Sequence, residues 1–339
     1  MRQGLKSFSQ GGEARKYAMI LRSLNESEHV AYDVLARSHG TLFNRLEWIS
    51  LFAGRMQPFG IFEEGGQMVG GFSLYRERRM GLTIFRRAPF TPTCGPFIEV
   101  KAQNPVTVLE VKRKALESLI DYLDGYPRNL TMLPLDQRIS DTLPFIWRGY
   151  KVIPKYTYLI DLTQPREQIL KNMSSIRRND ISKAMRDGLV VQPTTDMRVV
   201  RDLVLATFGR QQKGLDGACL EAILFQYATP ANSYAFSTYR QGKPIATCFV
   251  VHDAQTAYYL LGGYDSQDRH HGAGALAVVE AIKRAQEMGL KIFDFEGSVL
   301  PAIEKYFRGF GGKLASYYTI NKAWLPVEFI LKLKNRELF

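Results

Sequence analysis

The stretch RHHGAGA, residues 269–275, lies between an aromatic-rich apolar run, TAYYLLGGYD, and a segment with helical periodicity, ALAVVEAIKRAQEMG. Apolar residues recur along one face of that segment, and Gly289 is a natural helix stop. The helix therefore begins at the glycine loop, where free backbone N–H groups and the helix dipole favour an anion. Because glycine has no Cβ, Gly272 and Gly274 let a phosphate approach the backbone closely. The stretch predicts an anion-binding loop at the start of a helix.

Outward from this loop, the chain shows one order of secondary-structure elements twice. Residues 189–320 read as a strand, two helices, three strands, the loop, a helix, a strand, a helix and a strand. Residues 17–162 have the same order, but the segment equivalent to the loop, FTPTCGPFIEV, lacks the glycine pattern. This pattern predicts an α/β fold with mixed sheets and two similar domains. We expect an N-terminal domain at 1–162, a basic helical insert at 163–188 and a C-terminal domain at 189–339.

The net charge, the spacing of cysteines and histidines, and the lengths of apolar runs bear on which ligands and compartments are expected. A net charge of +12 on 339 residues attracts anions such as nucleic acid, phosphorylated small molecules or an acidic membrane face, or serves solubility alone. Cys94, Cys219 and Cys248 are too far apart in sequence to predict a disulfide framework or a zinc site, and the five histidines lack metal-site spacing. The N-terminus has no apolar core of a signal peptide, and no apolar run reaches ~18 residues. We expect a cytoplasmic protein without metal and without integral membrane association.

Two segments outside the repeats carry basic charge. In the insert, we expect Ile176, Ile181 and Met185 to anchor a helix on the body of the protein. The basic residues of that helix either bind phosphate groups of a substrate or form only a solvated face. The C-terminal tail AWLPVEFILKLKNRELF reads as an apolar helix with a basic end, which either packs against the body or lies on a membrane surface.

The loop resembles that of a known family. The pattern R-x-x-G-x-G, formed here by Arg269, Gly272 and Gly274 at the start of a helix, resembles the pyrophosphate loop of the GNAT acyltransferase superfamily. The order of elements in residues 189–320 also resembles the GNAT fold. The resemblance implies an acyl-CoA donor site in the second half only, with the first half as a wall for the acceptor. It implies that the donor is bound by Arg269, His270, His271, Gly272, Ala273, Gly274 and Ala275.

Three further motifs resemble a narrower group. IRRNDISKA (176–184), FDFEGS (293–298) and YFRGFGG (306–312), in two tandem halves, are similar to the Fem family of peptidoglycan aminoacyltransferases and their GNAT-type relatives. Fem enzymes transfer an amino acid from aminoacyl-tRNA to a peptidoglycan precursor. That reaction, with tRNA as donor, is the alternative within the same fold. The intact glycine loop favours coenzyme A.

The strand KIFDFEG contains the predicted base. Period-two alternation puts Asp294 and Glu296 on one face, where buried carboxylates are costly unless they are paired or used. Glu296 stands at the C-terminal end of the strand, where such sheets open to ligands. We expect it to act as general base or to position the amine. The alternative is a structural ion pair with Arg177, Arg178 or Arg308.

A tyrosine is the predicted acid. GNAT enzymes often have a tyrosine on the helix after this strand that protonates the leaving thiolate, and Tyr306 stands there. A tyrosine with an ordinary pKa near ~10 can donate a proton at neutral pH. Tyr306 is alternatively a core residue, and Tyr264 is a second candidate. The predicted substrate contacts are Arg178, Lys183, Asp294 and Arg308.

These features together predict an N-acyltransferase. The acyl group would pass directly from acyl-CoA to an amine bound between the halves, on an anionic small molecule or cell-envelope precursor, with no role for DNA. Gly272→Glu would then lose most of the activity, because the carboxylate repels the pyrophosphate. The alternative from another class is a non-catalytic binder of nucleic acid, a membrane surface or another anionic ligand on a GNAT scaffold.

Overall fold

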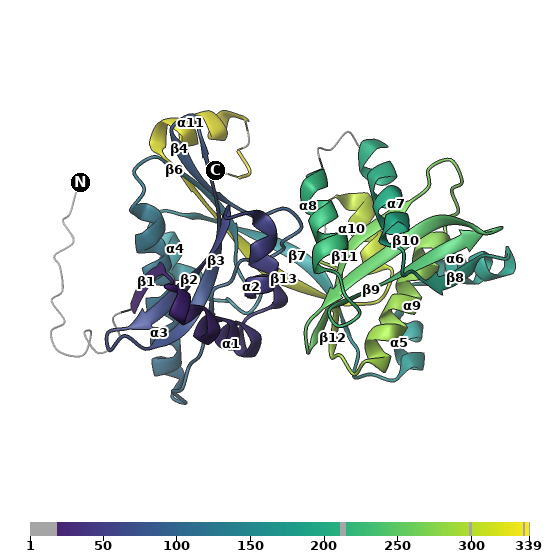
Figure 1. Cartoon of the computed structure of the whole chain (residues 1–339), viewed down its shortest axis with the longest axis horizontal. Coiled ribbons are helices and arrows are strands. Elements are labelled where there is room, and N and C mark those ends of the chain that lie inside the picture. Colours follow the sequence, from purple (N-terminus) through teal and green to yellow (C-terminus); the bar gives the residue numbers. More distant parts are fainter. Residues whose placement is uncertain (1–18, 211–214, 298–299, 335, 339) are drawn as a thin grey trace, which may run out of the picture.

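The computed structural model describes residues 19–210, 215–297, 300–334 and 336–338. Residues 1–16, on which the absence of a signal peptide was predicted, and Ser298 of the FDFEGS motif lie outside the described residues. Figure 1 shows two lobes side by side, with strands crossing between them.

The first half contains the predicted order of elements. In chain order they are β1 (Met19–Ser23), α1 (His29–His39), α2 (Leu46–Ile49), β2 (Met56–Glu63), β3 (Met68–Arg79), β4 (Leu82–Arg86), β5 (Phe97–Ile98), α3 (Pro105–Asp124), β6 (Asn129–Pro134), α4 (Leu143–Trp147) and β7 (Lys151–Asp161).

The insert forms two helices, and the second half follows. The elements are α5 (Arg166–Asn172), α6 (Ser175–Arg186), β8 (Val190–Pro193), α7 (Met197–Arg210), α8 (Gly217–Ala222), β9 (Ser233–Arg240), β10 (Lys243–His252), β11 (Thr256–Tyr264), α9 (Ala273–Glu287), β12 (Ile292–Asp294), α10 (Pro301–Arg308), β13 (Lys313–Ala323) and α11 (Leu325–Lys334). The predicted α/β fold with mixed sheets and a repeated order is confirmed.

The two halves exchange their last strands. The described residues form one sheet in the order β1-β2-β3-β4-β6-β13-β7-β12-β11-β10-β9-β8, with β5 beside β3. β13 of the second half pairs with β6 of the first, and β7 of the first half pairs with β12 of the second. β7 and β13 also pair with each other between them. The division at 162 and 189 stays a prediction, and in the sheet the two halves interlock.

A buried helix, α9, begins at the glycine loop, as predicted. Val278, Ile282 and Ala285 of α9 are at most 3% exposed, and α9 packs on β9 and β10. Gly289 follows the helix with φ 76°, a left-handed conformation that glycine adopts without strain.

β12 pairs with β11 along its whole length, but only with the beginning of β11. They run parallel where Thr256–Tyr258 face Ile292–Asp294, and then they part. Glu296 and Gly297 have φ values of 60° and 67°, which turn the chain out of the strand. A Cβ on Gly297 would lie 1.9 Å from the carbonyl oxygen of Tyr156 in β7, so only glycine fits this turn.

The insert helix α6 is anchored by a different face from the predicted one. Ile176 and Met185 are 62% and 64% exposed, whereas Arg177 and Ala184 are buried. The expectation that Ile176 and Met185 anchor the helix was wrong. The small side chain of Ala184 faces Gly272, which lets α6 lie close against the glycine loop, and this contact sets the rotation of the helix. Ile181, which is half-buried, does contact the core.

No helix in the described part of the chain combines the length and apolarity needed to cross a bilayer.

Candidate functional site

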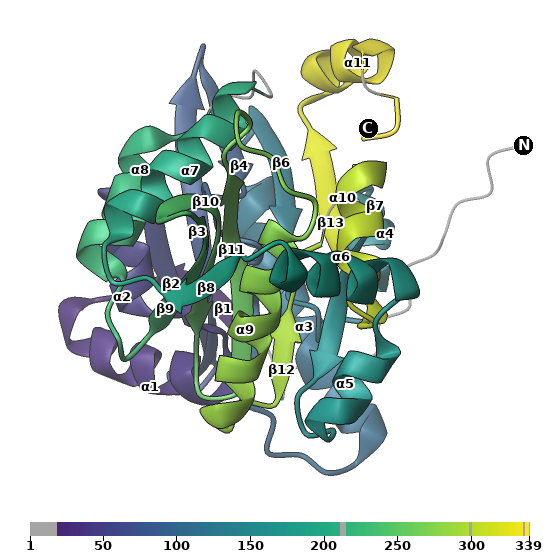
Figure 2. The ribbon, with the colours of Figure 1, turned by 90° about the vertical axis from the view of Figure 1, so that its right-hand side faces the viewer.

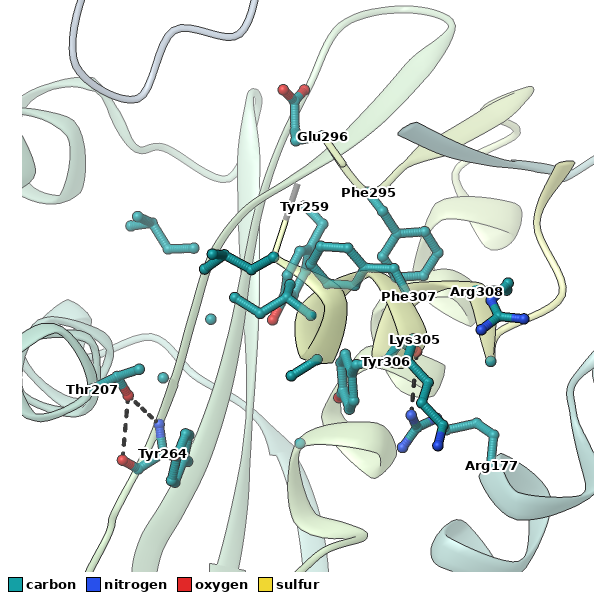
Figure 3. Close-up of a pocket in the computed structure, with 18 of the residues that line it drawn as sticks. Arg177, Thr207, Tyr259, Tyr264, Phe295, Glu296, Lys305, Tyr306, Phe307 and Arg308 are labelled. Atoms are coloured by element: carbon teal, nitrogen blue, oxygen red, sulfur yellow. Dashed lines mark hydrogen bonds between the residues drawn. The ribbon is translucent and has the colours of Figure 1, made fainter. Parts of the chain in front are cut away.

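A cavity of about 980 Å³ opens where β11 and β12 part (Figure 3). Its walls come from residues 259–264 of β11, residues 295–297, α10 and the start of α6, and the glycine loop lines one end. β11 has a bulge at Leu260, because Phe249 and Val250 of β10 pair with its two neighbours and not with Leu260 itself. Bulges often lie next to active sites, where they redirect backbone groups. One cavity thus connects the loop with the predicted base.

His270 holds the loop in shape. Its Nδ1 accepts a hydrogen bond from the Gly272 N–H at 3.1 Å, and its Nε2 lies 3.0 Å from the Asp187 carboxylate at the end of α6. A neutral imidazole that accepts at Nδ1 carries its proton on Nε2, which then donates to Asp187. The hydrogen bond from His270 lowers the pKa of the Asp187 carboxyl.

The N–H groups that remain for an anion belong to Gly274 and Ala275. The Gly272 N–H bonds to the His270 ring, and the Ala273 N–H bonds to the His270 carbonyl oxygen at 3.2 Å. No partner within the described residues engages the N–H of Gly274 or Ala275. Arg269 and His271 also line this end of the cavity. An anion here would meet backbone donors, the helix dipole and a guanidinium group.

Replacing Gly272 by alanine is expected to lower the free energy of unfolding by about 1–3 kcal/mol, the usual cost of overpacking. A Cβ at this position would lie 2.0 Å from the carbonyl oxygen of Asp180. Denaturant unfolding measures the effect. Gly274→Ala is the matched control, since its Cβ would meet only the Tyr306 hydroxyl, at 3.1 Å. A Gly272→Ala protein as stable as the wild type would contradict the close contact between α6 and the loop.

This packing corrects one expectation. Gly272→Glu was predicted to act through the charge of the new carboxylate, but any side chain at Gly272 collides with α6. That variant would disturb the fold whether or not a phosphate binds. Gly274 lines the cavity and is the position where the effect of an added negative charge on donor binding can be tested.

Glu296 lies where two cavities meet. It lines the large cavity and also a second one of about 280 Å³, whose walls come from both halves. In Figure 3 its carboxylate points away from the aromatic side chains of Phe295 and Tyr259. The Glu296 N–H donates to the Asp294 carboxylate at 2.8 Å, but no hydrogen bond or ion pair of the described residues engages the Glu296 carboxylate itself.

Both carboxyl groups have a raised pKa. Burial raises the pKa of Glu296 well above its usual value, the charge of Asp294 adds to the shift, and Arg87 opposes it. Burial also raises the pKa of Asp294 to about 6, although the Thr157 hydroxyl donates to it at 2.5 Å. A carboxylate with a raised pKa is a better proton acceptor near neutral pH.

None of the three arginines considered as structural partners of Glu296 pairs with it. The observed partners are Asp180 for Arg177 at 3.1 Å, Glu304 for Arg308 at 3.0 Å, and the carbonyl oxygens of Lys171 and Met173 for Arg178. The predicted structural ion pairs of Glu296 are therefore not formed.

Tyr306 lies at the loop end of the large cavity. Its hydroxyl would be 3.1 Å from a Cβ on Gly274, whereas Figure 3 shows Glu296 at the opposite end of the drawn site. Burial raises the pKa of the Tyr306 hydroxyl, so it keeps its proton at neutral pH. Tyr306 also belongs to the core around α10. Its role as proton donor to a thiolate stays a prediction. Tyr264, the second candidate, lines the cavity from the end of β11.

Two of the four predicted substrate contacts line a cavity, and the other two do not. Arg308 lines the large cavity and Asp294 lines the second one. Arg178 and Lys183 line neither, because they lie on the outer side of α6. Lys183 pairs there with Asp187 at 3.0 Å.

Arg177 is the functional candidate that the sequence analysis passed over. Its guanidinium is buried and lines the large cavity, stacks 4.2 Å from the centre of the Tyr306 ring and donates to the Tyr306 carbonyl oxygen at 3.2 Å. Its Nε is buried and has no hydrogen-bond partner in the described part of the chain. A signal existed in the sequence, since Arg177, Ile181 and Ala184 share one helical face.

The described residues contain no cluster of three or more His, Cys, Asp or Glu side chains able to hold a metal ion. All three cysteines are buried free thiols, and burial raises the pKa of Cys94 and Cys219 to about 12. Their thiolate forms are therefore suppressed at neutral pH.

Comparisons with known proteins agree with this geometry. Residues 177–308 match the family model described as an acetyltransferase (GNAT) domain, a segment that runs from α6 to α10. A comparison with curated protein sequences found no match.

Solved structures resemble almost the whole chain. FemX is 12% identical with a TM-score of 0.65, over 92% of this chain and 99% of FemX. The C-terminal domain of a putative lysylphosphatidylglycerol synthetase from Agrobacterium fabrum is 12% identical with a TM-score of 0.56, over 91% and 95%. L-PGS from Bacillus licheniformis is 11% identical with a TM-score of 0.52, over 91% and 95%. At these identities the likeness concerns the fold. The chain therefore has a GNAT-type fold in two interlocked halves, and residues 177–308 match the acetyltransferase (GNAT) domain model.

Proposed function

We propose that this protein is an N-acyltransferase that uses an acyl-CoA donor and an amine acceptor. One observation carries the proposal: a single cavity is lined both by the start of α9 and by Glu296. Among the described residues, neither the N–H groups of Gly274 and Ala275 nor the Glu296 carboxylate has a partner. A donor with phosphate groups at one end and a thioester at the other matches that arrangement. The acetyltransferase family model on residues 177–308 supports the same class of donor.

At the donor end, the pyrophosphate would accept hydrogen bonds from the Gly274 and Ala275 N–H groups, with Arg269 alongside. The arm that carries the acyl group would then lie in the gap between β11 and residues 295–297, lined by Tyr259 and Leu260. This direction brings the thioester towards Glu296.

The acceptor would enter through the second cavity. That cavity is lined by acidic groups, Asp136, Asp253 and Asp294, and by basic groups, Arg37, Arg45 and Arg138. The carboxylates favour an amine near Glu296. The Nε of Arg45 is buried and has no hydrogen-bond partner among the described residues, which fits an acceptor that carries an anionic group beyond its amine.

The reaction would proceed by direct transfer. The neutral amine attacks the thioester carbonyl carbon, the C–S bond breaks, and an amide bond forms. Glu296 takes the proton that the amine nitrogen loses and passes it to the thiolate of the product. Tyr306, beside Gly274 at the loop end, would donate this proton only to a thiolate held at that end of the cavity. Buried thiols with raised pKa values give no support to a covalent cysteine intermediate.

A thermal-shift titration tests the donor. Purified protein with coenzyme A, acetyl-CoA or long-chain acyl-CoA is expected to unfold at a higher temperature. A ligand at 100 times its dissociation constant adds about 2.7 kcal/mol of stability, which the assay resolves easily. Parallel samples contain tRNA at low and high salt. Stabilisation by tRNA alone would contradict the acyl-CoA proposal.

The second candidate is aminoacyl transfer from tRNA in the manner of Fem enzymes. It is favoured by the motifs at 176–184, 293–298 and 306–312 and by the likeness of fold to FemX over nearly the full chain. It predicts stabilisation by tRNA that weakens steeply with salt, because binding releases counterions from the phosphate backbone. A non-catalytic anion binder would be stabilised by a ligand in the same assay but would show no turnover.

A further inference from the structure

The C-terminal helix α11 presents an unpartnered apolar face. Leu325 is 79% exposed, Phe329 66%, Ile330 53% and Leu333 74%. At about 100° per residue, these side chains and Pro326 fall within one arc of about 140°. None of the side chains described in this helix is buried. Its inward side, which includes Val327 and Leu331, rests on β13.

Basic side chains border this face on both edges. On the same helical projection, Lys332 falls just outside the arc beside Leu325, and Lys334 falls just outside it beside Ile330. Lys332 forms an ion pair with Glu328 at 2.7 Å on the inward side, so its aliphatic chain runs along the helix. At the start of the helix, Arg128 stacks 5.3 Å from the ring centre of the half-exposed Trp324. An apolar stripe flanked by basic residues is typical of helices that lie in a membrane interface.

A second protrusion reaches the same end of the molecule. Figures 1 and 2 show α11 and the hairpin between β3 and β4 at the upper end in both views. Met80 at the tip of that hairpin is 93% exposed, and Arg78 and Arg79 precede it. An apolar tip next to basic residues repeats the chemistry of α11, so the two elements define one basic, apolar end.

We propose that the α11 face binds the surface of an anionic lipid bilayer, with the helix lying in the plane of the interface. The inference is independent of the acyltransferase proposal. Anionic headgroups would pair with Lys332, Lys334 and Arg128 while the apolar stripe enters the boundary with the acyl chains. A second copy of this chain is a poorer occupant, because face-to-face docking brings the flanking lysines of two proteins, each with a net charge of +12, against one another.

Vesicle co-sedimentation of the full chain tests this proposal. Vesicles of phosphatidylglycerol and phosphatidylethanolamine are expected to bind the wild type at least tenfold more strongly than vesicles of phosphatidylcholine alone. The double variant Phe329→Ser/Leu333→Ser and the single variant Lys334→Glu should each lower binding to the anionic vesicles at least tenfold. Val30→Ser is the matched control, since Val30 is 75% exposed on α1, at the opposite end of the molecule. It should bind like the wild type.

Unfolding temperatures of all variants establish that they fold. Two results would overturn the proposal: no binding of the wild type to anionic vesicles, or unchanged binding of the double variant. A wild-type dimer that becomes a monomer in the double variant, without vesicle binding, would assign the face to a second copy instead.

Discussion

Replacing Glu296 by glutamine is expected to lower kcat by about 10²–10⁴-fold, the usual contribution of a general base. Glutamine keeps the size of the side chain and removes its ability to take the proton from the amine. The Kd of the acyl-CoA should remain within about twofold, because Glu296 lies at the end of the cavity away from the glycine loop. Steady-state kinetics and a donor titration, on the same preparation, separate the two effects.

The pH dependence gives a second readout of Glu296. Burial and the charge of Asp294 raise the pKa of Glu296, and the base works only when deprotonated. The rate should therefore rise with pH through a value well above the ordinary pKa of a glutamate, ~4.3. Glu296→Gln should lose this rise together with most of the activity.

The control for this prediction is Glu280→Gln. Glu280 is a half-buried carboxylate on α9, paired with Lys283 and away from both cavities. Its loss should leave kcat and the pH profile unchanged. A Glu296→Gln enzyme with wild-type kcat would refute the assignment of the base, while leaving the donor site to be judged by its own test.

Replacing Gly274 by glutamate is expected to raise the Kd of the acyl-CoA by at least 100-fold. Its Cβ would meet only the Tyr306 hydroxyl, at 3.1 Å, which has to move by a few tenths of an ångström. A carboxylate in the first turn of a helix is itself favourable for the free protein. The same carboxylate would occupy the place of the pyrophosphate and repel it. The free variant should thus unfold at the wild-type temperature or slightly above it, yet lose the thermal shift caused by the donor.

Gly274→Gln separates charge from bulk, because glutamine has nearly the same shape without the charge. It should weaken the donor at least tenfold less than glutamate does. Equal losses in the two variants would mean that steric blocking is sufficient, and unchanged affinity in both would remove the loop from the donor site.

The structural features that depend on local sequence pattern were predicted correctly. Periodicity and punctuation gave the order of strands and helices in both halves, the start of α9 and its stop at Gly289. Glu296 was singled out as the end of a strand, but β12 ends two residues earlier, at Asp294, and Glu296 lies in the turn that follows. Its carboxylate lines a cavity and has no partner among the described residues. Whether nearby arginines neutralise it depends on contacts between distant segments, which periodicity does not contain.

The wrong prediction for α6 and the unforeseen strand exchange also arise from contacts between distant segments. α6 has apolar residues on two faces, and contact with Gly272 of a distant loop selects the one with Ala184 and Arg177. The motif around Arg178 and Lys183 drew attention to the solvent side of the helix. The exchange of β7 and β13 likewise joins strands far apart in sequence, so no local signal announces it.

That exchange has a consequence for how the protein is made. β6 pairs with β13, so Leu133 has no strand partner on this edge until Ile320, far later in the chain, has been synthesised. During translation the edge of the first half therefore stays open while the whole second half is added. Open edges are templates for pairing with other chains, and pairings of such long range form slowly. We expect the N-terminal half expressed alone to self-associate, and the nascent chain to depend on chaperones until β13 has been synthesised and released.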